Sequence, residues 1–142
     1  MRIQLFAVGR MKSGPERDLA ARYFDRFAKV APPLGLEFGG VVEVAESRAR
    51  DVDQRKREEA AKLAESLSAG SVLILLDERG KNLASPDVAN LITKHRDSGT
   101  RAMTFAIGGA DGHAEESRQK AQTVLSFGAM TYPHQIMRIL VD

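Results

Sequence analysis

Two kinds of apolar pattern alternate along the chain. Short continuous runs of β-compatible residues predict strands at 2–9, 36–44, 71–77 and 102–109. Apolar residues spaced three or four positions apart predict amphipathic helices at 15–30, 51–68, 85–95 and 115–125. A last short apolar piece, 128–131, precedes an apolar helical pattern at 135–141. This alternation predicts an α/β fold, a mostly parallel sheet with helices on both faces.

Local signals refine several of these elements. The run 71–77 is continuously apolar, as in strands buried on both faces of a parallel sheet. Gly39-Gly40 indicates a bulge or bend in the second strand. Ser85-Pro86 is typical of an N-cap followed by proline at the first helical position. The charged run 55–59, "RKREE", predicts a solvated helix face.

Three loops follow the carboxyl ends of predicted strands, where parallel sheets bind their ligands. They come after Leu76-Asp77, at Gly108-Gly109, and around Met130 to His134. The second loop lies in "FAIGGADGH" (105–113), which matches neither the dinucleotide nor the phosphate-loop glycine pattern. The three loops converge if their strands are neighbours.

Composition narrows the class of protein. The 142 residues are enough for a single domain, 1–142, and 43% of them are hydrophobic. The chain has no cysteine, and its three histidines lack metal-ligand spacing, so we expect no metal site. The apolar start is too short for a signal peptide or a spanning helix, so we expect a cytoplasmic protein without membrane contact. A net charge of +2 permits an RNA partner but does not argue for one.

The carboxyl-terminal segment "LSFGAMTYPHQIMRILV" (125–141) carries a family resemblance, together with "FAIGGADG" and the early "AVGR". These motifs resemble the bacterial large-subunit ribosomal RNA pseudouridine N3-methyltransferases, minimal members of the SPOUT class of S-adenosylmethionine enzymes. The resemblance covers nearly the whole chain. It implies a carboxyl-terminal trefoil knot, which topology rules alone would exclude. It also implies a homodimer and S-adenosylmethionine as the cofactor.

The resemblance also implies a cofactor site. An apolar slot would hold the adenine, and glycine would let the backbone approach the ligand closely. Taken alone, Gly108-Gly109 is equally typical of a plain loop, and Leu76, Phe127 and Met130 are equally typical of core packing. The implied cofactor contacts are Leu76, Gly108, Phe127, Gly128, Ala129, Met130, Thr131 and Tyr132.

The resemblance makes His134 and Arg138 the candidate catalytic residues, and their i, i+4 spacing puts both on one side of a helix. In the functional interpretation Arg138 holds an RNA phosphate or the target base, while His134 shapes the mouth of the pocket. In the alternative interpretation Arg138 pairs with Asp142, and His134 satisfies a backbone group at the helix start. Arg10 and Lys12 are candidate RNA contacts or ordinary surface residues.

The activity that the resemblance implies is methyl transfer from S-adenosylmethionine to N3 of a pseudouridine in the large-subunit ribosomal RNA of the assembled ribosome. Members of this family continue beyond the position of Asp142, so we expect a chain truncated at its carboxyl end and impaired in activity. The alternative is a knotted dimer that binds RNA or the ribosome with little catalysis. A third hypothesis is a small-molecule-binding α/β protein unrelated to RNA.

Overall fold

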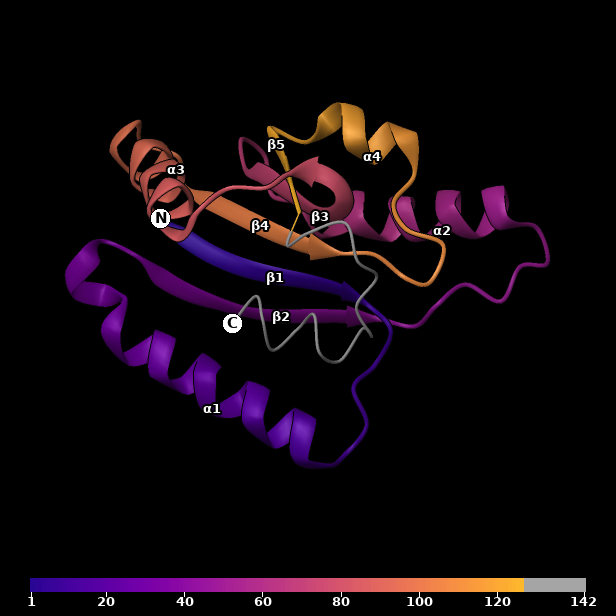
Figure 1. The fold of residues 1–142 in the computed structure, drawn as a ribbon, viewed down its shortest axis with the longest axis horizontal. Helices are drawn as coiled ribbons and strands as arrows, with labels where there is room; N and C mark the ends of the chain where they lie inside the picture. Colours follow the sequence, from indigo (N-terminus) through magenta and orange to yellow (C-terminus); the bar gives the residue numbers. More distant parts are fainter. Residues whose placement is uncertain (127–142) are drawn as a thin grey trace.

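The structure, a computed structural model, describes residues 1–126 of the chain. Five strands and four α-helices alternate, with one short 3-10 helix between α1 and β2 (Figure 1). In chain order the elements are β1 (Arg2–Val8), α1 (Pro15–Val30), η1 (Pro32–Leu34), β2 (Glu37–Val44), α2 (Val52–Ser66), β3 (Val72–Lys81), α3 (Ser85–Asp97), β4 (Ala102–Ile107), α4 (Glu115–Lys120) and β5 (Thr123–Leu125).

The strands form one sheet in the order β2-β1-β4-β3-β5, and every neighbouring pair is parallel. The predicted α/β class is therefore confirmed. The bulge predicted at Gly39-Gly40 is also present: Ile3 pairs with Phe38 but Leu5 pairs with Val41, so β2 carries an extra residue there. The predicted knot concerns residues outside the described part of the chain.

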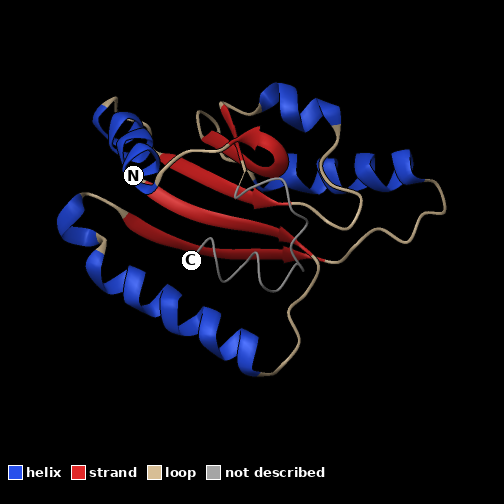
Figure 2. Ribbon diagram, in the orientation of Figure 1, coloured by secondary structure: helices blue, strands red, loops and turns tan. Residues whose placement is uncertain are grey.

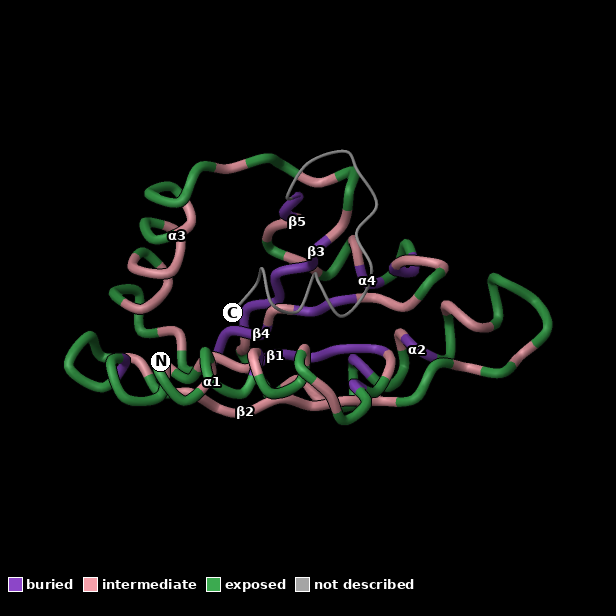
Figure 3. Tube along the Cα trace, turned by 60° about the horizontal axis from the view of Figure 1, so that its bottom comes forward, coloured by how far each residue is buried: buried purple, intermediate pink, exposed green. Residues whose placement is uncertain are grey.

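Helices cover both faces of the sheet, as the alternation predicts (Figure 2). Successive β1 side chains point to opposite faces, with Leu5 and Ala7 in one core cluster and Phe6 and Val8 in the other. The first cluster is covered by α1 and α3, the second by α2 and the region of α4. Figure 3 shows the most buried segments running along the central strands.

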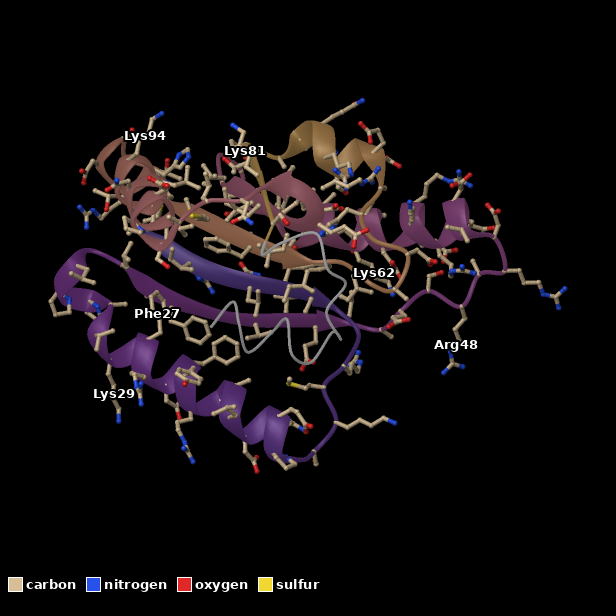
Figure 4. All side chains as sticks on the ribbon, in the orientation of Figure 1. Phe27, Lys29, Arg48, Lys62, Lys81 and Lys94 are labelled. Carbon is tan, nitrogen blue, oxygen red and sulfur yellow. The ribbon has the colours of Figure 1, made fainter. Side chains whose placement is uncertain are left out.

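An aromatic contact fixes α1 on its face. The rings of Phe24 and Phe38 stack with centroids 5.2 Å apart, and Phe27 meets Phe38 edge to face at 5.9 Å. Phe27 points from the helix toward the sheet in Figure 4. Tyr23, one turn before Phe27 in α1, is 36% exposed, and the guanidinium of Arg26 lies over its ring.

The predicted helix 115–125 is wrong in its second half. α4 ends at Lys120, and Thr123–Leu125 forms β5 along the edge of β3. Gln122 redirects the chain, because its N–H donates to the Leu73 carbonyl at 2.9 Å and its side-chain Oε1 accepts from the Leu73 N–H at 2.7 Å. The β-branched pair Thr123 and Val124 suits the strand that follows.

Two further predictions about helix positions need correction. Ser85 is not the N-cap of α3: the extended residue Ala84 caps the helix without a side-chain bond, so Pro86 follows the first helical residue. The charged run 55–59 is not a uniformly solvated face, because Glu59 is only 6% exposed. Its burial follows from packing of α2 on the sheet, where Glu59 faces the end of β1 and Gly109.

Candidate functional site

The loop predicted at Gly108 follows the carboxyl end of β4, whereas the loop predicted after Leu76-Asp77 is wrong, because β3 continues to Lys81. Leu76 pairs with Ile107 in the sheet, so Gly108 begins its loop beside Leu76 and Asp77. Leu76 is 8% exposed and belongs to the core cluster beneath α1 and α3, so the core packing is observed, and its contact with a cofactor stays a prediction. The other predicted site residues lie outside the described residues: Phe127, Gly128, Ala129, Met130, Thr131, Tyr132, His134 and Arg138.

The loop from Gly108 to Gly112 closes on itself. The Gly112 N–H donates to the Gly109 carbonyl at 3.0 Å, and Gly112 has a φ of 83°, which favours glycine. A Cβ on Gly108 would lie 3.1 Å from the Gly112 carbonyl carbon and 3.3 Å from His113 Cε1. The closure of the loop thus favours glycine at 108 independently of any ligand, a reason that the sequence analysis did not identify.

His113 ties the end of this loop to the sheet. Its Nε2 lies 3.2 Å from the Ala106 carbonyl oxygen, and the residue is 8% exposed. Burial lowers the pKa of His113, although the charge of Asp77 opposes that shift. A neutral imidazole at this point is a structural hydrogen-bonding group rather than a cation.

Asp77, the residue after Leu76 in β3, forms an ion pair with Arg118 of α4 close to His113. The Arg118 guanidinium donates to Asp77 Oδ2, and the Arg79 N–H donates to Oδ1 at 2.9 Å. Burial acts to raise the pKa of Asp77, but these hydrogen bonds outweigh it and lower that pKa. Sequence reasoning noted Asp77 only as the end of a strand and missed Arg118 and His113. Asp77, His113 and Arg118 are far apart in the sequence, so no local motif indicated that they form a cluster.

The α2 helix reaches the loop from the face of the sheet that it shares with the region of α4. Arg55 pairs with Asp111, with 2.7 Å between Nε and Oδ2. Glu59, one turn further along α2, accepts a hydrogen bond from the Ser47 N–H at 2.9 Å. Burial raises the pKa of Glu59. A small pocket separates α2 from the loop and is lined by Lys56, Glu59, Gly108, Gly112 and His113, among others.

This arrangement suits an uncharged, flat ligand group better than a metal or a phosphate. No cluster of three or more potential metal ligands occurs among residues 1–126. Asp77 and Asp111 are already paired with arginines. A glycine-built loop beside a buried leucine offers an apolar wall and backbone polar groups, the donor set that the adenine of S-adenosylmethionine requires. The residues present therefore fit that cofactor. In the same part of the chain, no helix is long and apolar enough to cross a membrane.

Comparisons with known proteins agree with this fit. A family model described as "Predicted SPOUT methyltransferase" matches residues 1–141. The chain is 61% identical over 141 residues to "Ribosomal RNA large subunit methyltransferase H" of Rhizobium leguminosarum bv. trifolii, covering 99% of this chain and 88% of the relative. The proteins of the same name from Agrobacterium fabrum and Mesorhizobium japonicum are 59% and 54% identical, with the same coverage.

Proposed function

Because the chain belongs to the SPOUT methyltransferase family, we propose that it transfers a methyl group from S-adenosylmethionine to N3 of a pseudouridine in large-subunit ribosomal RNA. The relatives' name supports the ribosomal RNA substrate. The choice of N3 and of pseudouridine rests on the resemblance of the segment 125–141.

One observation carries the cofactor part of the proposal. Leu76, in the last residue pair between β3 and β4, lies beside Ile107, and the Gly108 loop starts directly after it at the carboxyl end of β4. Parallel sheets hold their ligands beyond such strand ends. We assign the adenine to the wall made by Leu76 and the Gly108 loop, completed by residues 127–132. When bound, S-adenosylmethionine would supply an electrophilic methyl group.

The chain's own residues have three tasks in this reaction. They exclude water from the methyl group, orient the base, and accept the proton that N3 loses as its bond to carbon forms. Among the described residues, Asp77 and Asp111 are held in ion pairs and are poorly suited to that last task. We assign orientation of the RNA to Arg138, and the mouth of the pocket to His134.

Labelled S-adenosylmethionine tests the proposal in two steps. Calorimetric titration of the 142-residue chain should give saturable binding, and incubation with ribosomes lacking the modification should put label into large-subunit RNA. Mass spectrometry of the digested RNA then identifies the modified nucleoside. Binding without methyl transfer would favour the alternative, a dimer that binds RNA with little catalysis. No binding of the cofactor would contradict the proposal.

A further inference from the structure

Arg55 joins three segments that are distant in sequence. Its Nε and Nη2 donate to the two carboxylate oxygens of Asp111, at 2.7 and 3.2 Å. Its Nη1 donates to the carbonyl oxygens of Ala49 and Arg50, at 3.0 and 3.1 Å. The planar guanidinium thus spans α2, the connection before α2 and the loop at Gly108. A lysine ammonium lacks the fork that this geometry uses.

Glu59, one helical turn after Arg55, also contacts both the segment before α2 and the loop at Gly108. Its Oε2 accepts from the Ser47 N–H at 2.9 Å, in the same connection that Arg55 contacts. Its Oε1 would lie 3.2 Å from a Cβ on Gly109, so the carboxyl group packs against the loop backbone. Among the described residues, this buried Oε1 has no hydrogen-bond partner. Arg48, in the same connection, instead extends away from the body of the protein (Figure 4).

We propose that Arg55 and Glu59 are positioning residues, a clamp on α2 that holds the loop 108–112 in the shape needed for the cofactor. Each residue contacts both the connection 47–50 and the loop, so the two contacts restrain the loop from the same side. The inference rests on the proposed function, since it assigns the Gly108 loop to the cofactor.

The purpose of the clamp is geometry rather than stability. The side chains of Arg55 and Asp111 are 25% and 22% exposed, so solvent screening reduces what their ion pair contributes to the free energy of unfolding. A fixed loop, however, presents its backbone groups at the distances that a ligand needs, and a small misplacement costs affinity steeply. Loss of the clamp should therefore weaken cofactor binding more than it destabilises the fold.

Hydrogen exchange on the cofactor-free protein tests the clamp directly. In Arg55→Ala, the amides of 108–113 should exchange about tenfold faster than in the wild type, since local opening becomes easier. Arg57→Ala, an exposed arginine on the same helix, is the matched control and should leave exchange unchanged. Unchanged exchange in Arg55→Ala would overturn the clamp.

Cofactor affinity provides the second measurement. Arg55→Ala and Asp111→Ala should each raise the Kd for S-adenosylmethionine about tenfold, with little change in Tm and in kcat at saturating cofactor. The double variant should lose no more cofactor affinity than either single variant, because both changes break the same ion pair.

Additive losses of affinity would contradict the assignment of Arg55 and Asp111 to one pair, and an equal Kd in Arg55→Ala and wild type would exclude the clamp from cofactor binding. Wild-type protein that binds no cofactor would overturn the proposed function, while the exchange experiment still decides the clamp.

Glu59 is tested by two substitutions of similar size. Glu59→Gln keeps an oxygen that accepts from the Ser47 N–H, so its Kd should stay near the wild-type value. Glu59→Leu leaves that N–H without its acceptor and should raise the Kd and accelerate exchange in the loop. Loss of cofactor affinity in both variants, or in neither, would contradict the role assigned to this hydrogen bond.

Discussion

Burial shifts the pKa values of two residues around the loop 108–113 in opposite directions. Burial raises the pKa of Glu59 and lowers the pKa of His113, so both groups favour their neutral forms. Each shift couples protonation to folding, with a sign that depends on the kind of group. Two measurements on single-residue variants separate them.

For His113, acid should destabilise the protein. Because its pKa is lowered from 6.5, the unfolded state takes up a proton before the folded state does. The free energy of unfolding should therefore fall as the pH drops below 6.5, and this part of the dependence should vanish in His113→Gln. Urea unfolding at about pH 5.5 and about pH 7.5 measures it, with the half-buried His95→Gln as control. A slope that persists in His113→Gln would exclude this residue as its source.

For Glu59, the sign is reversed. Its pKa is raised above 4.5, so as the pH rises through that value the unfolded state releases its proton first and the free energy of unfolding falls. Glu59→Gln should lack this fall and be more stable than the wild type at neutral pH. Urea titrations from about pH 4.5 to about pH 7.5 check this, and the exposed Glu65→Gln on the same helix should keep the wild-type slope. Equal stability of wild type and Glu59→Gln across the range would refute the prediction.

Gly108 carries the strongest single-residue prediction for binding. Gly108→Val should abolish binding of S-adenosylmethionine, because its Cβ would lie only 3.1 Å from the Gly112 carbonyl carbon and its two methyl groups would add further bulk inside the loop. The rest of the fold should persist, since the loop follows β4 rather than forming part of it. Calorimetry measures the binding, and circular dichroism with a thermal melt checks the fold. Unchanged affinity would remove Gly108 from the site.

Among the elements, β5 shows how far periodicity alone can predict the fold. The central strands were predictable because their apolar runs are continuous, and the helix α1 because Pro15 begins it and Pro32 follows it. The segment 115–125 misled the prediction because "EESRQKAQ" has helical composition, while the strand that follows is set by pairing with β3. A three-residue edge strand forms only through its pairing with the neighbouring strand, and the local sequence pattern does not indicate which strand that is.

Gln122 is therefore the test of this element. Gln122→Leu leaves the buried Leu73 N–H without its side-chain acceptor, which should lower the free energy of unfolding by about 1–3 kcal/mol. Gln122→Glu retains an acceptor oxygen at the same position and should cost less. Urea unfolding of the two variants measures the difference. If Gln122→Leu and Gln122→Glu are equally stable, the hydrogen bond does not hold β5 in place.

At the scale of the whole molecule, the site divides into a part that sequence could predict and a part that it could not. The rule that ligands bind beyond parallel strands predicted that Leu76 and Gly108 would meet, and the sheet order brings them together. The supporting contacts were not predictable, since Arg55 and Asp111 are separated by 56 positions and Asp77 and Arg118 by 41. Charged residues in a sequence indicate solvent-exposed positions, and only the folded structure shows which of them form ion pairs.

The quaternary prediction also belongs to the whole molecule. We expect a homodimer, because the family resemblance implies one and a 15.5 kDa chain offers little surface for gripping folded RNA. Light scattering coupled to size exclusion should give about twice the mass of the chain at micromolar concentration. A monomer under those conditions would contradict the prediction and require another account of how the substrate is held.

The order of the strands also governs how the protein can be made. β4 lies between β1 and β3, yet it is synthesised after both of them. A nascent chain that has not reached Ile107 holds a β1-β2 pair and a separate β3, and the two halves have no strand to join them. The sheet can therefore form completely only after β4 has been synthesised. Until then the apolar edges of β1 and β3 stay unpaired and exposed. The loop 108–112, which directly follows β4, arises in that same closing step.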